Sequence, residues 1–387
     1  MTSPSSPTSP ISSTSPISAV RLPDPYPYYA TLVAERPFAY DDDLSAWVAS
    51  DAEAVTAVLR AEALRVRPPA EPVPAGIVGT PAGEVFGSLV RMTDGDVRGR
   101  LKRVVVDALG HADLAAAARL AADRTRAVLA RGGEVPYEEL MFGVPARVVA
   151  GLCGLDAGVD DEAARLIGDF VQCIPATATP DQQRAAAEAA GQLQKLLGPG
   201  IERAADGLLG DLVRAARAAD WADTAPLLAN AIGFLSQTYD ATAGLIGNTL
   251  VALARGHAVP PTADGLELLV REVVRYDAPI QNTRRFAARP FRHRGAEVEP
   301  GQSVLVLLAA ANRDPAANAD PHTLRPGRPD PTVFTFGADA HHCPGRDLAV
   351  AIATATIDTL LTSGAHPSTL PTTPAYRPLA NARIPLL

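Results

Sequence analysis

The chain has 387 residues, of which 47% are hydrophobic and 5% aromatic, and this length allows one or two domains. Its formal net charge of −8 argues against a nucleic-acid-binding protein. The three cysteines show no disulfide pattern, which fits a reducing compartment, and no apolar run is long enough to span a bilayer. We therefore expect a cytoplasmic protein that binds neither nucleic acid nor membrane.

Residues 1–20 are rich in serine, threonine and proline. They lack the basic start and apolar centre of a signal peptide, so a disordered tail is expected, with the folded domain over 21–387. Residues 44–50 then alternate like a strand, and residues 51–64 show helical spacing. The segment 67–87 is rich in proline and glycine without a regular period, which predicts either a functional loop or a flexible insertion.

Arg98 and Lys102 belong to a basic cluster that opens an apolar helical stretch. Such charge runs usually form a solvated helix face. Helical patterns follow almost without interruption over 113–217, and core packing accounts for their apolar residues.

Residues 226–255 predict a single helix of about 45 Å. The stretch is apolar nearly all round, so we expect it to run through the interior. A polar cluster interrupts it, Ser236-Gln-Thr-Tyr-Asp240-Ala-Thr242. Because buried polar groups are costly unless they are paired, this cluster indicates either an internal hydrogen-bond network or a functional site.

Glu272 and Arg275 lie three residues apart in a stretch of leucine and valine. An acid–base pair at this spacing is normally a weak surface contact, but its apolar flanks predict a buried pair. A turn and a strand over 303–308 follow it.

Cys343 stands between a glycine-bearing turn and an apolar helix predicted over 347–361. The amino end of a helix offers free N–H groups and a positive dipole, so a lowered thiol pKa is expected. Pro344 has no N–H, so donors to the sulfur must come from Gly345 or Arg346, and Phe336 is placed to exclude water. A thiolate of this kind is a ligand for a large, soft metal centre.

Other interpretations of the cysteines are weaker. Cys153 and Cys173 lie in apolar stretches and are expected to be small buried hydrophobic residues. A zinc site built from His341, His342 and Cys343 would need a second pair of ligands, and no such pair follows.

The pattern Phe336-Gly-x-x-x-His341-x-Cys343-x-Gly345 resembles the haem-binding loop of the cytochromes P450. The resemblance departs at Asp339, where the family has a second glycine, and it extends from about residue 22 to the C-terminus. It implies a mainly α, single-domain fold with a small β region. It also implies haem b, with Cys343 as the axial iron ligand and with His341, Phe336 and Gly345 around the cofactor.

The resemblance assigns further positions. Arg98 and Lys102 occupy the places of a His-x-x-x-Arg motif that contacts a haem propionate and contributes to the redox-partner surface. Arg285, in preference to Arg284, takes the place of a propionate-binding arginine. The Glu272–Arg275 pair matches a structural brace behind the haem loop, and 67–87 matches a segment that covers the distal face.

In the long helix, Ala243-Gly-Leu-Ile-Gly-Asn248 fixes the register against the family's oxygen-binding helix. Asp240 then takes the position of the catalytic acid, Ala241 replaces the usual threonine, and Gln237 lies where the family has a small residue above the iron. Protons must therefore come through Asp240, Thr242, water or the substrate. Thr242 lies about 100° round the helix from position 241 and is a poor substitute.

These features lead us to expect a haem-thiolate oxidoreductase of specialised-metabolite biosynthesis, similar to the soluble bacterial members of the family. It would act as a monomer, using O2 and electrons from NAD(P)H through ferredoxin reductase and ferredoxin. The loss of the helix threonine favours oxidative cross-linking of an aromatic substrate, such as a small Tyr- or Trp-containing peptide. The alternatives are a conventional hydroxylase or monooxygenase of a small natural product, a peroxide-driven peroxygenase, and a non-catalytic haem-binding or sensing protein.

Overall fold

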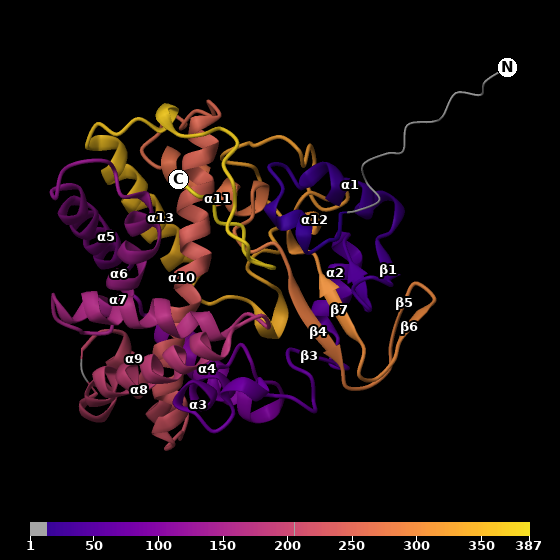
Figure 1. Cartoon of the computed structure of the whole chain (residues 1–387), viewed down its shortest axis with the longest axis horizontal. Coiled ribbons are helices and arrows are strands. Elements are labelled where there is room, and N and C mark those ends of the chain that lie inside the picture. The colour runs from indigo at the N-terminus through magenta and orange to yellow at the C-terminus, as the bar shows by residue number, and fades with distance from the viewer. Residues whose placement is uncertain (1–13, 205) are drawn as a thin grey trace.

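The computed structural model describes residues 14–204 and 206–387. Its central element is the helix α10, Thr224–Ala254, which crosses the middle of a mainly helical body, while the sheet lies to one side of it (Figure 1). Asp223 caps this helix by accepting a hydrogen bond from the Ala225 N–H at 3.1 Å. The predicted interior helix over 226–255 is therefore confirmed within two residues at each end.

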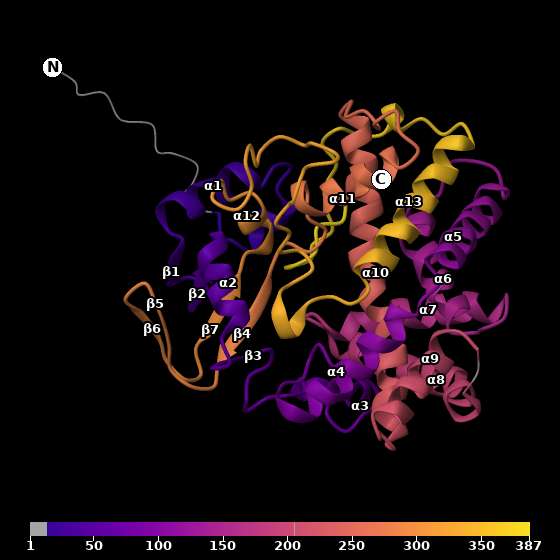
Figure 2. The same cartoon turned by 180° about the vertical axis from the view of Figure 1, so that it is seen from behind.

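The remaining helices surround α10 or cover the sheet. They are α1 (Tyr26–Glu35), α2 (Ala52–Arg60), α3 (Pro81–Ser88), α4 (Gly95–Gly110), α5 (Leu114–Leu129), α6 (Val144–Leu152), α7 (Val159–Phe170), α8 (Pro180–Arg203), α9 (Leu208–Ala218), α11 (Gly265–Tyr276), α12 (Leu308–Asn312) and α13 (Arg346–Thr362). The reverse view shows α13 beside both α5 and α10, which it contacts (Figure 2). No helix in these residues is long and apolar enough to cross a membrane.

Five short strands form the main sheet in the order β1-β2-β7-β4-β3, and β5 and β6 form a separate hairpin. Only the β2–β7 pair within the main sheet is parallel. The strands are β1 (Phe38–Asp41), β2 (Ala46–Ala49), β3 (Leu64–Arg65), β4 (Thr283–Ala287), β5 (Phe291–His293), β6 (Ala296–Val298) and β7 (Ser303–Val306). A mainly α fold with a small β region is thus confirmed.

The two ends of the described chain meet at Arg383, whose side chain is 1% exposed. Its guanidinium donates to the Asp277 carboxylate at 2.8 Å and to the carbonyls of Val20, Leu22 and Pro23 at 2.7–2.9 Å. These contacts fix the segment before α1 against the end of the chain. A buried arginine is stable here because its donors are paired.

Two expectations need correction. Residues 18–21 form a short 3-10 helix, and Ala19 and Val20 are fully buried, so the ordered part begins before the predicted boundary at residue 20. Residues 1–13 lie outside the described part of the chain. The predicted irregular loop 67–87 contains α3, which Thr80 caps by accepting from the Gly83 N–H at 3.2 Å.

Candidate functional site

Cys343 lies in a tight loop between the sheet side of the molecule and α13. The Cys343 N–H donates to the Phe336 carbonyl at 2.8 Å, which closes the loop on itself. Gly337 makes this closure possible, because it has φ +69° and a Cβ there would lie 2.9 Å from the His341 carbonyl oxygen. The loop therefore presents the sulfur at a backbone position that is fixed by its own hydrogen bonds.

The Cys343 sulfur accepts a hydrogen bond from the Gly345 N–H, as the missing donor at Pro344 predicts. This bond and the charges of Lys102 and Arg346 all lower the pKa of the thiol, but its burial outweighs them and raises the pKa overall. The expected lowering of the Cys343 pKa was thus wrong for the protein without a bound metal. The expectation took account of the hydrogen-bond donors to the sulfur but not of the free-energy cost of burying a thiolate.

Asp339 replaces the second glycine of the family pattern and keeps the backbone conformation that glycine favours, with φ +50°. Its carboxylate pairs with Arg60 of α2 at 2.7 Å, and both side chains are exposed. Aspartate tolerates the left-handed region better than most residues, so the loop keeps its turn without the glycine.

We expect Asp339→Val to lower the free energy of unfolding by about 1–2 kcal/mol, because a β-branched residue is strained at positive φ. Asp339→Gly should differ from the parent protein by less than about 1 kcal/mol, since it loses only an exposed ion pair. Urea denaturation of the three proteins measures both effects. Equal stability of the valine and glycine variants would contradict the role assigned to this turn.

A cluster of cations lies beside the loop, at the start of α4 and on β4. Arg98 and Arg285 are 8% and 6% exposed, and the His341 ring lies between Arg98 at 3.1 Å from Nδ1 and Asp94 at 3.5 Å from Nε2. Burial lowers the pKa of His341, and the two guanidinium groups lower it further. Burial likewise lowers the pKa of Arg285 to about 10, although the nearby Asp94 opposes this. Two buried guanidinium groups thus share one carboxylate.

The predicted choice between the two arginines of β4 follows from the strand's alternation. Arg285 points inward and Arg284 is exposed. Arg285 makes hydrogen bonds only with the Arg284 carbonyl at 2.9 Å and the Thr283 hydroxyl at 3.4 Å, and no described carboxylate forms an ion pair with it. An anion is needed to compensate this charge.

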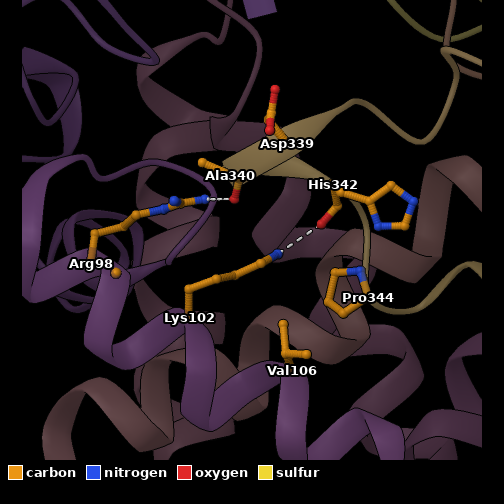
Figure 3. Close-up of a pocket in the computed structure, with 8 residues that line it drawn as sticks. Arg98, Lys102, Val106, Asp339, Ala340, His342 and Pro344 are labelled. Atoms are coloured by element: carbon orange, nitrogen blue, oxygen red, sulfur yellow. Dashed lines mark hydrogen bonds between the residues drawn. The ribbon is translucent and has the colours of Figure 1, made fainter. Parts of the chain in front are cut away.

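Lys102 holds α4 against the outer side of the loop. Its ammonium donates to the His342 carbonyl at 2.9 Å, while Arg98 donates to the Ala340 carbonyl (Figure 3). Burial lowers the pKa of Lys102 to about 8, and the charge of Arg98 adds to this. Lys102 therefore ties the helix to the loop instead of joining the His341 cluster. The residues of these contacts also line a surface pocket of about 420 Å³. The pocket is lined by Arg98, Gly99, Lys102, Val106, Asp339, Ala340, His342 and Pro344.

The polar cluster of α10 is more exposed than the rest of this helix's middle part. Residues 237–241 are partly exposed, although the helix is buried on both sides of them. Gln237 folds back along the helix, with Nε2 donating to the Gly233 carbonyl at 3.0 Å, and Thr238 bonds the Phe234 carbonyl at 2.7 Å. Thr242 is fully buried, and its hydroxyl has no partner among the described residues.

Asp240 is the one carboxyl group in this polar cluster. Burial raises its pKa, and the nearby positive charges of Arg377 and Arg91 partly offset the shift. Neither arginine forms an ion pair with it in the described chain, since Arg377 pairs with Glu138 at 2.6 Å. A raised pKa makes a carboxyl a better holder and donor of protons than an ordinary aspartate.

The Glu272–Arg275 pair is buried, as its apolar flanks predict. Arg275 is fully buried and contacts both Glu272 oxygens at 2.6 and 3.0 Å, and it donates to the carbonyls of Asn312, Pro321 and Thr323. Glu272 also accepts from Arg328 at 3.3 Å and from the Arg325 N–H at 3.0 Å. The pair thus anchors the long segment that leads to the Cys343 loop.

Comparisons with known proteins agree with this geometry. The family model described as Cytochrome P450 matches residues 265–363, which include the Glu272–Arg275 pair and Cys343. A P450-family relative from Xylella fastidiosa is 31% identical over 221 residues, or 55% of each chain. The crystal structure of CalO2 superposes with a TM-score of 0.80 and 24% identity over 94% of both chains. The chain is thus similar to the cytochromes P450 in the sequence of residues 265–363 and in its fold.

Another relative is 6-deoxyerythronolide B hydroxylase of Saccharopolyspora erythraea, with 30% identity over 217 residues. The alignment covers 53% of the present chain and 52% of that protein. The match thus spans about half the length of the curated relatives.

The residues present fit the haem that the P450 family implies. Two buried guanidinium groups share the single carboxylate of Asp94, which leaves positive charge for the anionic propionates. Gly345 has φ −92°, and a Cβ there would meet no protein atom within 4 Å, so packing of the chain does not explain this glycine. A cysteine thiolate is one of the protein ligands that hold haem iron, and the Gly345 N–H lowers the pKa of the Cys343 thiol.

Sequence reasoning missed two charged residues of this candidate site. Asp94 orients His341 and also accepts the Val66 N–H at 3.0 Å, but no motif marks it. Arg91 lies near Asp240, and its only signal is a lone cation within the apolar stretch Ser88-Leu-Val-Arg-Met92. A charge in such a stretch is either paired inside the protein or faces a ligand.

Proposed function

We propose that this chain is a cytochrome P450, a haem-thiolate oxidoreductase of the monooxygenase type. The observation that carries the proposal is the Cys343 sulfur, held by the Gly345 N–H in a closed loop beside buried, under-compensated arginines. Cys343 would ligate the iron, while Arg98, Arg285 and His341 would hold the propionates. When bound, the haem supplies activation of O2 and oxidation of the substrate.

The protein's own contribution on the distal side is control of protons. Ala241 has no hydroxyl, and Thr242 is fully buried. Asp240 is the acid of this region, and its raised pKa allows its carboxyl to hold a proton and pass it on. Gln237 keeps its amide N–H on its own helix at the Gly233 carbonyl, so this N–H does not deliver protons in the same arrangement.

The missing hydroxyl favours oxidative cross-linking over oxygen insertion. Coupling of two aromatic groups removes two hydrogens from the substrate, and the phenol or indole group of such a substrate can itself supply a proton that the missing hydroxyl would otherwise relay. We propose a small aromatic substrate, such as a Tyr- or Trp-containing peptide, in specialised-metabolite biosynthesis. Hydroxylation is the second candidate, and it is favoured by the similarity to 6-deoxyerythronolide B hydroxylase.

Electrons would reach the site on the Cys343 side. The pocket beside the loop is lined by Arg98 and Lys102, and the exposed Arg346 lies next to it in the chain. A positively charged surface attracts an acidic electron carrier. We propose a ferredoxin, reduced by NAD(P)H through a reductase, as the partner of a monomeric P450 in the cytoplasm.

The product mass distinguishes the two reactions. Purified P450 is incubated with NAD(P)H, a surrogate ferredoxin and reductase, and a panel of Tyr- and Trp-containing tri- to pentapeptides. We expect a product lighter than its substrate by two hydrogens, and Asp240→Asn should lower its rate because a proton-holding carboxyl is lost. A product heavier by one oxygen, without any coupled species, would favour the hydroxylase instead. Arg100→Gln, which changes an exposed residue of α4, controls for general damage.

A further inference from the structure

Arg91 is held rigidly beside α10. The preceding residue is fixed on both sides, because the Val90 N–H donates to the Asn230 side chain at 3.1 Å and the Val90 carbonyl accepts from Arg98 at 3.2 Å. Leu89 packs so closely on α10 that a Cβ on Gly233 would lie 2.8 Å from its side chain. The Arg91 side chain therefore begins at the turn of α10 that precedes Gln237.

The Arg91 guanidinium has no protein partner among residues 14–204 and 206–387. Its Nε is buried without a hydrogen bond, and the residue forms no ion pair there. Asp240 is near enough for each charge to shift the pKa of the other group, but the two do not form an ion pair. A guanidinium that is partly desolvated and unpaired is costly, so the site is short of one anion.

Within the described chain, the unpaired charge of Arg91 is separate from the unpaired charge of Arg98 and Arg285 beside His341. The nearby charge of Asp94 raises the pKa values of Arg98 and Arg285, whereas the nearby charge of Asp240 raises the pKa of Arg91. Arg91 therefore belongs to the distal group of α10 and not to the His341 cluster. Arg91 and residues 237–241 are all partly exposed.

We infer that Arg91 binds a carboxylate group of the substrate. A guanidinium presents two parallel N–H donors that match a carboxylate, which would satisfy the donors that the protein leaves unpaired. The inference rests on the proposed function and narrows its substrate class to organic acids, including peptides with a free C-terminus.

The test is a spectral titration of the oxidised holoenzyme with ω-(imidazol-1-yl)alkanoic acids of increasing chain length and with the matching carboxamides. For at least one chain length, the acid should bind roughly tenfold or more tightly than the amide, as expected for a hydrogen bond to a charged group. Arg91→Gln should reduce this ratio to about one, and Arg91→Lys should retain part of it.

Arg100→Gln is the matched control, since Arg100 is exposed on α4 and stacks over Trp221 at 5.6 Å. It should keep the ratio of the parent protein. Equal binding of acid and amide at every chain length, or a ratio that Arg91→Gln leaves unchanged, would overturn the inference. The carbon monoxide spectrum of each protein is recorded in parallel. A normal haem-thiolate band without acid preference refutes the carboxylate site alone, whereas a missing band in the parent protein refutes the proposed function.

Discussion

Cys343→Ala is expected to abolish the strongly red-shifted Soret band that the dithionite-reduced parent protein should show under carbon monoxide. The reason is that Cys343 is the sulfur that the loop presents beside the buried arginines, with a hydrogen bond from the Gly345 N–H. Alanine is also a small side chain, but it has no sulfur that could ligate the iron. The absorption spectrum and the haem content of the purified variant measure the effect, and we expect the red-shifted band to be lost completely.

The chain contains its own controls, because Cys153 and Cys173 are buried thiols elsewhere in the core. Cys173 is 3% exposed, and its thiol donates to the Phe170 carbonyl at 3.1 Å, so it lies in the core and is not part of the Cys343 loop. Cys173→Ala should leave the band in place. A parent spectrum typical of histidine-ligated haem, unchanged by Cys343→Ala, would contradict the assignment of the axial ligand.

Glu272→Gln is expected to lower the free energy of unfolding by about 3–5 kcal/mol, because it leaves buried arginines without their counter-charge. Glu272 and Arg275 are 4% and 0% exposed, and Arg328 shares the same carboxylate at 3.3 Å. The substitution keeps the shape of the side chain, so packing changes little. Chemical denaturation, followed by circular dichroism, measures the loss.

A second acid on the same helix serves as the control. Glu267 pairs with Arg271 at 2.8 Å, but these side chains are 45% and 42% exposed. Glu267→Gln should therefore cost no more than about 1 kcal/mol, as is usual for exposed ion pairs. Similar losses for the two glutamine variants would show that burial of the Glu272 pair does not set its strength.

The sequence was informative wherever a local pattern reflects burial. The apolar flanks of Glu272 and Arg275 predicted a buried pair, and the alternation of β4 matched the choice of Arg285 over Arg284. The missing N–H of Pro344 correctly pointed to Gly345 as the donor to the sulfur.

The remaining features depend on contacts between distant segments. Arg91 meets α10 across 140 residues, through the bond between Val90 and Asn230, and no spacing in the chain announces this contact. The sign of the Cys343 pKa shift was also missed, because the desolvation that decides it comes from the whole fold and not from the adjacent helix. The same reason applies to α3, whose cap and packing surface override a stretch rich in proline and glycine.

The contact of Arg383 with Val20, Leu22 and Pro23 sets an order of events during synthesis. Arg383 is at least 360 residues away from each of these partners in the sequence. The segment before α1 therefore cannot dock on Arg383 until almost the whole described chain has been made. At 5–20 residues per second the delay is roughly 20 to 70 s. During this time the apolar side chains of that segment remain exposed on the nascent chain. The ribosome-bound polypeptide should therefore need chaperone protection at residues 18–23 during this delay.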